Sequence, residues 1–274
     1  MHVLVTGGNG TLGSALRAEA ARRGDAFTAW ERATCQPDDM AGLAPYLARI
    51  APDALVHAAV PSTGTGRPDE GRLVNIEWTA RLARAAAERG LPFLYISTVM
   101  VFTDNAKGPF TPESEPDAKD GYGFEKLQGE RAARDANPEA RIARIGWQIG
   151  EQPGGNHMLS FFVDKMRTEG VIRASTKWLP ATSFLPDTAA ALLDLLAMPA
   201  SLYHVNANTH WTFFEIATAL NALHGGSWRV EPNEDFVYDQ RLFDPRVPIP
   251  PLSARLSELK NLPHNAHNAQ KAFL

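Results

Sequence analysis

The stretch that decides the fold is Val3-Leu-Val-Thr-Gly7-Gly-Asn-Gly10-Thr-Leu-Gly13, and an alanine-rich segment, 14–23, follows it. An apolar strand that leads into glycines spaced three apart and then into a helix is typical of a dinucleotide-binding turn. Glycine permits the tight turn, the close approach of the backbone to a pyrophosphate and the close packing of helix on strand. The N-terminus of the helix presents N–H groups and a partial positive charge to the phosphates. An ordinary glycine turn would lack this context. We therefore expect Gly7, Asn9, Gly10, Thr11, Leu12 and Gly13 to bind a dinucleotide.

The composition indicates a globular protein with a full-sized core: the chain has 274 residues, of which 44% are hydrophobic and 21% charged. The formal net charge of -4 and the lack of a Lys/Arg run argue against nucleic acid or an anionic membrane as a partner. A single cysteine, Cys35, excludes an internal disulfide and fits a reducing compartment. No apolar run approaches the roughly 20 residues that span a bilayer. Because Met1-His2 lead straight into the first strand, we expect no signal peptide and a cytoplasmic location.

The first half of the chain alternates strand and helix signals, which predicts a parallel sheet with crossover helices. The predicted strands are 26–30, 53–59, 91–97 and 140–146, and the predicted helices are 42–50, 72–89 and 122–136. A polar stretch rich in proline and glycine, 103–121, precedes the last of these helices. We expect an α/β fold in which residues 1–150 form a Rossmann-type, doubly wound dinucleotide-binding domain.

From about Gly150 the alternation becomes irregular. The pattern predicts helices at 156–170, 187–198 and 212–224, a strand at 202–206, and a proline-rich tail that ends in a helix-like segment, 252–259. We interpret 151–274 as a smaller α/β substrate-binding part, from which the helix near 187–198 returns to the first domain. The histidines at 204, 210, 264 and 267 lack carboxylate or cysteine neighbours in a metal-site pattern, so no metal is expected.

A second informative string is Tyr122-Gly-Phe-Glu-Lys126. On a helix, a spacing of four places both side chains on one face, one turn apart. A fixed ammonium favours tyrosinate, so we expect Lys126 to lower the pKa of Tyr122 from its ordinary value of about 10. Many surface helices carry such a Tyr/Lys pair by chance. The pair is informative here because the same chain also contains the glycine-rich loop.

Five stretches stand in the order of a known family: Thr6–Gly13, Pro52–Ala59, Val74-Asn75, Tyr95-Ile-Ser-Thr98 with Val101-Phe102, and Tyr122–Glu130. Together they resemble the extended short-chain dehydrogenase/reductases, most closely the dTDP-4-dehydrorhamnose reductase branch. The resemblance covers most of the chain and is strongest up to about residue 150. It implies NADP or NAD as cofactor, a nucleotide-sugar substrate and, as is common in the superfamily, a homodimer.

The resemblance also implies roles for individual residues. Tyr122 would protonate the ketone oxygen as general acid, and Lys126 would hold the nicotinamide ribose and activate Tyr122. Thr98 would hydrogen-bond the substrate carbonyl, unless it only ends its strand. Ala58 and Ala59 would let the cofactor approach the backbone. Trp147 would lie near the sugar or, with equal weight, pack in the core.

Cofactor choice depends on Glu31 and Arg32, which follow the second predicted strand. An acidic residue here accepts from the ribose 2′-OH of NAD, whereas arginine pairs with the 2′-phosphate of NADP. Because both residue types are present, NAD and NADP both stay open.

The chain departs from the branch after its fourth predicted strand. Where the branch usually has Ser-Thr-Asp-Tyr-Val-Phe, this chain has Ser97-Thr-Val99-Met100-Val-Phe102. A site built to hydrogen-bond a hydroxyl discriminates strongly, because its polar groups would otherwise stay unpaired. Since Val99 replaces that aspartate, we expect Val99 to contact a different or less hydroxylated sugar. The predicted function is NAD(P)H-dependent reduction of a ketone on a nucleotide-linked deoxysugar. Two alternatives stay open: an epimerase or dehydratase with bound NAD, which normally adds a carboxylate near Thr98, and a non-catalytic, dinucleotide-binding regulatory subunit.

Overall fold

The computed structural model describes residues 1–61 and 63–260, and the chain divides into two compact units. Of these residues, unit 1 comprises those within 1–103, 116–144 and 189–203, and unit 2 comprises 104–115, 145–188 and 204–260. The chain therefore passes between the units several times. Part of the proline-rich stretch, 104–115, belongs to unit 2.

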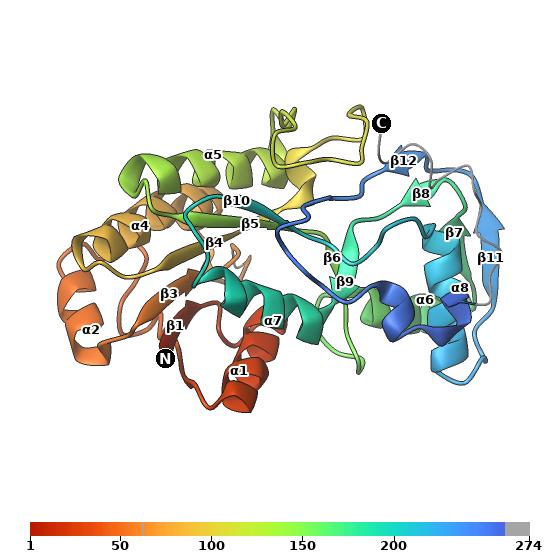
Figure 1. The fold of residues 1–274 in the computed structure, drawn as a ribbon, viewed down its shortest axis with the longest axis horizontal. Coiled ribbons are helices and arrows are strands. Elements are labelled where there is room, and N and C mark those ends of the chain that lie inside the picture. The colour runs from red at the N-terminus through yellow and green to blue at the C-terminus, as the bar shows by residue number, and fades with distance from the viewer. Residues whose placement is uncertain (62, 261–274) are drawn as a thin grey trace. The chain divides into compact units, whose positions relative to one another are not determined.

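The central sheet has six strands in the order β10-β5-β4-β3-β1-β2 (Figure 1). They are β1 (His2–Thr6), β2 (Ala26–Ala29), β3 (Ala54–His57), β4 (Phe93–Thr98), β5 (Arg141–Ile145) and β10 (Leu202–Val205). β1 pairs in parallel with β2 on one side and with β3 on the other, and β3 pairs in parallel with β4. The strand order reverses at β1, so the loop that follows β1 lies at the topological switch point where α/β folds bind ligands. The predicted Rossmann-type fold is confirmed.

Helices cover both faces of this sheet. Figure 1 shows α1 (Thr11–Arg23) and α7 (Leu185–Leu195) on one face and α4 (Thr79–Glu88) and α5 (Gly121–Ala136) on the other, with α2 (Leu43–Ile50) beyond β3. Arg23 joins α1 to α7: its guanidinium donates to the Asp194 carboxylate (2.7 Å) and to the Ala190 carbonyl (2.9 Å). The predicted helix at 72–89 is present as three consecutive segments, α3 (Glu70–Arg72), the π-helical η2 (Leu73–Trp78) and α4.

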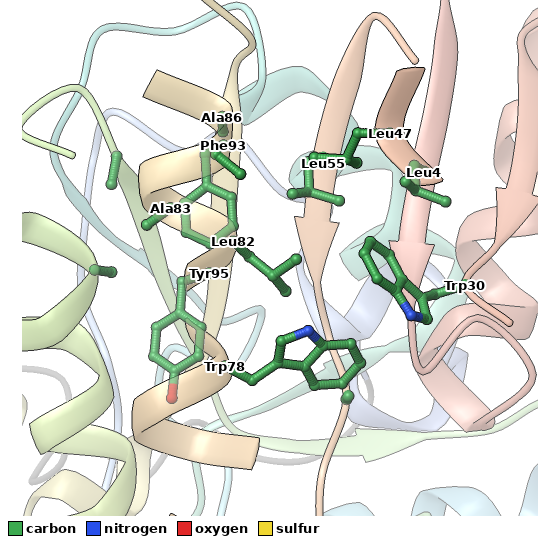
Figure 2. Close-up of a cluster of buried hydrophobic side chains, with 14 of the residues drawn as sticks. Leu4, Trp30, Leu47, Leu55, Trp78, Leu82, Ala83, Ala86, Phe93 and Tyr95 are labelled. Carbon is green, nitrogen blue, oxygen red and sulfur yellow. The ribbon is translucent and has the colours of Figure 1, made fainter. Parts of the chain in front are cut away.

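The core of unit 1 lies between the sheet and α4. Leu4, Leu55 and Phe93 from three neighbouring strands are fully buried, and Leu82 of α4 packs in the same cluster (Figure 2). A strand covered on both faces has a near-continuous apolar sequence. This is why β1, β3 and β4 were predictable from short runs of apolar residues.

Unit 2 contains α6 (Met158–Glu169), α8 (Phe213–Leu223) and three short parallel ladders. The ladders pair β6 (Trp147–Ile149) with β9 (Thr182–Phe184), β7 (Ile172–Ser175) with β11 (Val230–Asn233), and β8 (Trp178–Leu179) with β12 (Tyr238–Asp239). None of these strands was predicted, because two to four residues are too few to show an alternating pattern.

The helix-like segment expected at 252–259 consists of two short 3-10 helices, η4 (Leu252–Ala254) and η5 (Ser257–Lys260), rather than one continuous helix. Burial of Leu252, Leu256 and Leu259 holds these two helices against unit 2.

Over the described residues, no helix is both long and apolar enough to cross a bilayer. The same residues contain no cluster of three or more His, Cys, Asp or Glu side chains arranged for a metal ion. His264 and His267 lie outside the described residues.

Candidate cofactor and catalytic site

Packing within the glycine-rich loop explains two of its glycines. Gly7 has a φ of +68°, and a Cβ atom there would lie 2.8 Å from the Ala58 carbonyl oxygen. A Cβ atom on Gly13 would lie 2.3 Å from the Gly7 carbonyl oxygen. Larger residues at these positions would separate β1, β3 and α1.

Gly10 differs from both. Its φ is -81°, which any residue adopts, and the nearest atom to a Cβ placed there is the Gly7 carbonyl oxygen at 3.3 Å. Gly10 is also the N-cap of α1, where no side chain caps the helix and no acidic residue occupies the first turn. The space in front of this N-terminus therefore suits an anion. Asn9 lies beside it and accepts a hydrogen bond from Arg17 (2.7 Å).

A buried network connects this loop to the end of β3. The Thr6 hydroxyl accepts hydrogen bonds from the backbone N–H groups of Ala58 (3.1 Å) and Ala59 (3.2 Å). His57 Nε2 donates to the Val74 carbonyl (3.1 Å), which leaves Nδ1 to accept from the Thr6 hydroxyl (2.6 Å). Burial lowers the pKa of His57 to about 3, and the charge of Lys126 adds to the effect. His57 is therefore a neutral structural residue that holds Ala58 and Ala59 against the loop.

Two glycines let α5 approach its neighbours closely. A Cβ atom on Gly123 would lie 1.9 Å from the Met100 carbonyl oxygen in the 3-10 turn η3 (Val99–Val101). A Cβ atom on Gly129 would lie 2.2 Å from the Asn75 carbonyl oxygen in η2. The glycine after Tyr122 is therefore needed to place Tyr122 and Lys126 next to η3 and β4.

Lys126 is buried (2% exposed), and its ammonium lies 4.1 Å from the centroid of the Tyr95 ring. Within 1–61 and 63–260 this ammonium makes no hydrogen bond. Burial lowers the pKa of Lys126 to about 7, while the charges of Glu130 and Glu125 raise it. A buried cation that makes no hydrogen bond costs free energy, so this position of Lys126 does not favour the stability of the fold.

Tyr122 lies one turn before Lys126 at the start of α5, and 38% of its side chain is exposed. The expected lowering of its pKa is wrong for this structure. The pKa is instead raised to about 12, because burial against the protein disfavours tyrosinate and the charge of Glu125 adds to the effect. The phenol is thus protonated at neutral pH.

Thr98, Val99 and Met100 are consecutive in the sequence, but the turn after β4 gives their side chains different environments. The Thr98 hydroxyl accepts from the Met100 N–H (3.2 Å) and so caps η3, while its own proton stays available for donation. Val99, the expected substrate contact, is buried (3% exposed), whereas Met100 is 51% exposed. The apolar side chain that this turn offers to a ligand is therefore Met100.

Glu31 and Arg32 lie just beyond β2, as predicted, and their side chains have different partners. Glu31 is exposed, and its carboxylate accepts from the Thr34 hydroxyl (3.0 Å). Arg32 forms a bidentate ion pair with Glu70, with N···O distances of 2.5 and 3.0 Å.

Trp147 is half-buried in unit 2, within an aromatic cluster. Its ring stacks on Trp178 (centroids 6.3 Å apart) and meets Phe161 edge-on (5.3 Å). This environment favours the packing role, while the partial exposure leaves one part of the ring open.

Sequence reasoning missed two carboxylates of unit 1. Glu70 pairs with Arg32, and Glu125 accepts a hydrogen bond from the Asn75 amide (2.9 Å) beside the Tyr122–Lys126 pair. Glu125 was within the quoted string and could have been noticed. Asn75 lies in the π-helical η2, and such π-segments are frequent at functional sites.

Comparison with known proteins agrees with this geometry. The family described as "RmlD substrate binding domain" matches residues 1–245. The chain belongs to this family. Among its relatives, a dTDP-4-dehydrorhamnose reductase of Mycolicibacterium smegmatis is 25% identical over 242 residues, which cover 84% of this chain and 72% of the relative. A methionine adenosyltransferase 2 subunit beta of Xenopus tropicalis is 25% identical over 237 residues, covering 80% of this chain and 71% of that protein.

A solved structure shows the same fold as this member of the RmlD substrate binding domain family. It is the dTDP-4-dehydrorhamnose reductase of Bacillus anthracis in complex with NADP, which is 19% identical with a TM-score of 0.78. The match covers 95% of this chain and 98% of the other.

Proposed function

We propose that this chain is a reductase that uses NADPH or NADH to reduce a ketone on a nucleotide-linked deoxysugar. The observation that supports the proposal most is the buried Lys126 ammonium, which lies one helical turn from the partly exposed Tyr122 and has no hydrogen-bond acceptor among the residues that the structure describes. The ribose hydroxyls of a nicotinamide nucleotide would supply such acceptors. The similarity to the M. smegmatis dTDP-4-dehydrorhamnose reductase and to the NADP-bound B. anthracis reductase supports the proposal.

The residues of unit 1 fit a dinucleotide. The loop from Gly7 to Asn9 and the open N-terminus of α1, Gly10 to Gly13, would bind the pyrophosphate. Ala58 and Ala59 would line the cleft with backbone alone, and Glu31 or Arg32 would meet the adenosine ribose. When bound, the reduced nicotinamide supplies the hydride.

Tyr122 would then act as general acid. Because its pKa is raised to about 12, the phenol enters the reaction protonated and donates its proton to the carbonyl oxygen as negative charge develops there. Protonated Lys126 would stabilise the tyrosinate that forms. The free proton of the Thr98 hydroxyl would give the same oxygen a second donor, and two fixed donors stabilise a developing oxyanion.

The turn after β4 bears on the substrate. Exposed Met100 and buried Val99 offer no hydrogen-bonding side chain where the branch has an aspartate and a tyrosine. We therefore propose a deoxysugar with fewer hydroxyl groups on the side that meets this turn. The lack of a carboxylate between Thr98 and Phe102 gives the epimerase and dehydratase alternatives no support.

The test is oxidation of NADPH or NADH by the full chain with dTDP-4-keto-6-deoxyglucose and a panel of other keto-sugar nucleotides. We expect at least one sugar to be reduced in proportion to the nicotinamide consumed. If the chain binds a dinucleotide but reduces none of the panel, the reductase proposal fails.

Similarity to the Xenopus protein favours one second candidate, a regulatory subunit that binds a dinucleotide and a partner protein. This candidate predicts dinucleotide binding, no turnover, and a stable complex with a methionine adenosyltransferase catalytic subunit in gel filtration. Turnover without such a complex would exclude it.

A further inference from the structure

The ion pair between Arg32 and Glu70 lies where the adenosine half of a dinucleotide would bind. Arg32 follows β2, the strand next to β1, and in folds of this type the residue at this strand end contacts the ribose. The Arg32 side chain is 28% exposed, whereas the Glu70 side chain is 6% exposed. Both terminal nitrogens of Arg32 donate to Glu70, one to each carboxylate oxygen.

Glu70 is held in place by both hydrogen bonds of this pair. It is the first residue of the helical run that continues from α3 through η2 and α4, and a negative charge is favoured at the N-terminal end of such a run. Breaking the pair would leave a buried carboxylate without its cation, which is costly. An incoming anion would therefore compete poorly with Glu70 for the guanidinium of Arg32.

Glu31, Arg32 and Glu70 together carry a net charge of -1. Two arginines near Glu70 in the sequence are paired with other acids: Arg67 with Asp38 (2.8 Å) and Arg72 with Glu77 (3.1 Å). Arg17 of α1 instead donates to Asn9 (2.7 Å) and to the Gly8 carbonyl (3.4 Å) in the glycine-rich loop.

We propose that Glu70 is a specificity-determining residue that makes this chain prefer NADH to NADPH. This inference rests on the proposed function. A 2′-phosphate needs an arginine whose bidentate donors are available, and here Glu70 takes them and adds repulsion. A ribose 2′-OH carries no charge and can donate to the exposed Glu31 carboxylate.

Calorimetric titration of the full chain with NADH and with NADPH tests this inference without relying on turnover. We expect the wild-type chain to bind NADH at least about tenfold more tightly than NADPH. Glu70→Gln keeps an acceptor for Arg32 but removes the charge, so NADPH affinity should rise about tenfold and NADH affinity should stay within about twofold. In the double variant Arg32→Gln/Glu70→Gln the gain for NADPH should disappear.

Glu19→Gln is the matched control. Glu19, the ninth residue of α1 and away from the loop, forms a similar bidentate pair with Arg22 (2.7 Å for both bonds) and also accepts from Arg23 (2.7 Å). The Glu19→Gln substitution removes one negative charge from unit 1, as Glu70→Gln does, and should leave the ratio of the NADH and NADPH affinities unchanged.

An unchanged ratio in Glu70→Gln, a loss of NADPH affinity in that variant, or a wild-type preference for NADPH would each overturn the inference while leaving the proposed function in place. Failure of the wild-type chain to bind either dinucleotide would instead overturn the proposed function, and this inference with it.

Discussion

Replacing Lys126 with methionine should make the protein more stable and unable to use its cofactor. In the folded chain the pKa of Lys126 is lowered from 10.5 to about 7. At 1.36 kcal/mol per pKa unit, this shift corresponds to a destabilisation of about 4–5 kcal/mol at neutral pH. Losing the contact between the ammonium and the Tyr95 ring offsets about 1–2 kcal/mol. We therefore expect Lys126→Met to raise the free energy of unfolding by about 3 kcal/mol at pH 7.

The pH dependence gives this prediction its sign. The unfolded chain protonates Lys126 below about pH 10.5, and the folded chain does so only below about 7. The contribution of Lys126 therefore makes the wild-type chain less stable as the pH decreases from about 10.5 to about 7, and this contribution is constant below pH 7. The advantage of the methionine variant should be complete at pH 7 and should shrink towards pH 10.

Urea unfolding at pH 7 and at pH 9.5, together with titration of NADH, measures both effects. Lys165→Met is the matched control: Lys165 is 37% exposed on α6 and should change stability by no more than about 0.5 kcal/mol. A Lys126→Met variant that is less stable than wild type, or whose advantage does not depend on pH, would refute the reasoning. So would an undiminished affinity for NADH.

Substitutions at Gly10, Thr98 and Glu125 test the other parts of the site. Gly10→Val should abolish dinucleotide binding with only a small change in melting temperature. Its side chain fills the space before α1, and the Gly7 carbonyl, 3.3 Å from the added Cβ, needs to shift by only a few tenths of an ångström. Gly13→Val, whose Cβ would lie 2.3 Å from the same carbonyl, should unfold the chain instead. If Gly10→Val retains calorimetric affinity, the loop binds something else. Thr98→Val should lower turnover by roughly tenfold to 100-fold, whereas Thr98→Ser should restore most of it; equal rates in both variants would reduce Thr98 to a cap of η3. The charge of Glu125 raises the pKa of both Tyr122 and Lys126, and Glu125→Gln removes it. The pH profile of turnover should therefore move to lower pH in this variant. An unchanged profile would show that Glu125 does not influence the titration of these two residues during turnover.

Most of unit 1 was predictable because its signals are local. The inner strands β1, β3 and β4 are covered on both faces and appear as apolar runs, and Gly7 and Gly13 are required by close contacts of the loop with Ala58 and with the Gly7 carbonyl. The ladders of unit 2 were not predictable, because strands of two to four residues depend on partners up to about 60 residues away.

The site was predictable in its residues but not in its charges. Tyr122 and Lys126 lie on one helix as their spacing indicates, but the sign of the pKa shift of Tyr122 depends on burial, which the spacing does not reveal. The partner of Arg32 lies 38 residues away in the sequence, so neither the ion pair nor its consequence for the cofactor could be read from the second strand. Met100 rather than Val99 is exposed because η3 turns the first of these side chains outward and the second inward.

The most direct test of the central claim compares wild type with Tyr122→Phe in the oxidation of reduced nicotinamide by keto-sugar nucleotides. The account predicts turnover by the wild-type chain, a loss of roughly 100-fold or more in the variant, and nearly equal dinucleotide affinity in the two proteins. Equal turnover in both proteins would remove Tyr122 from the mechanism and contradict the account.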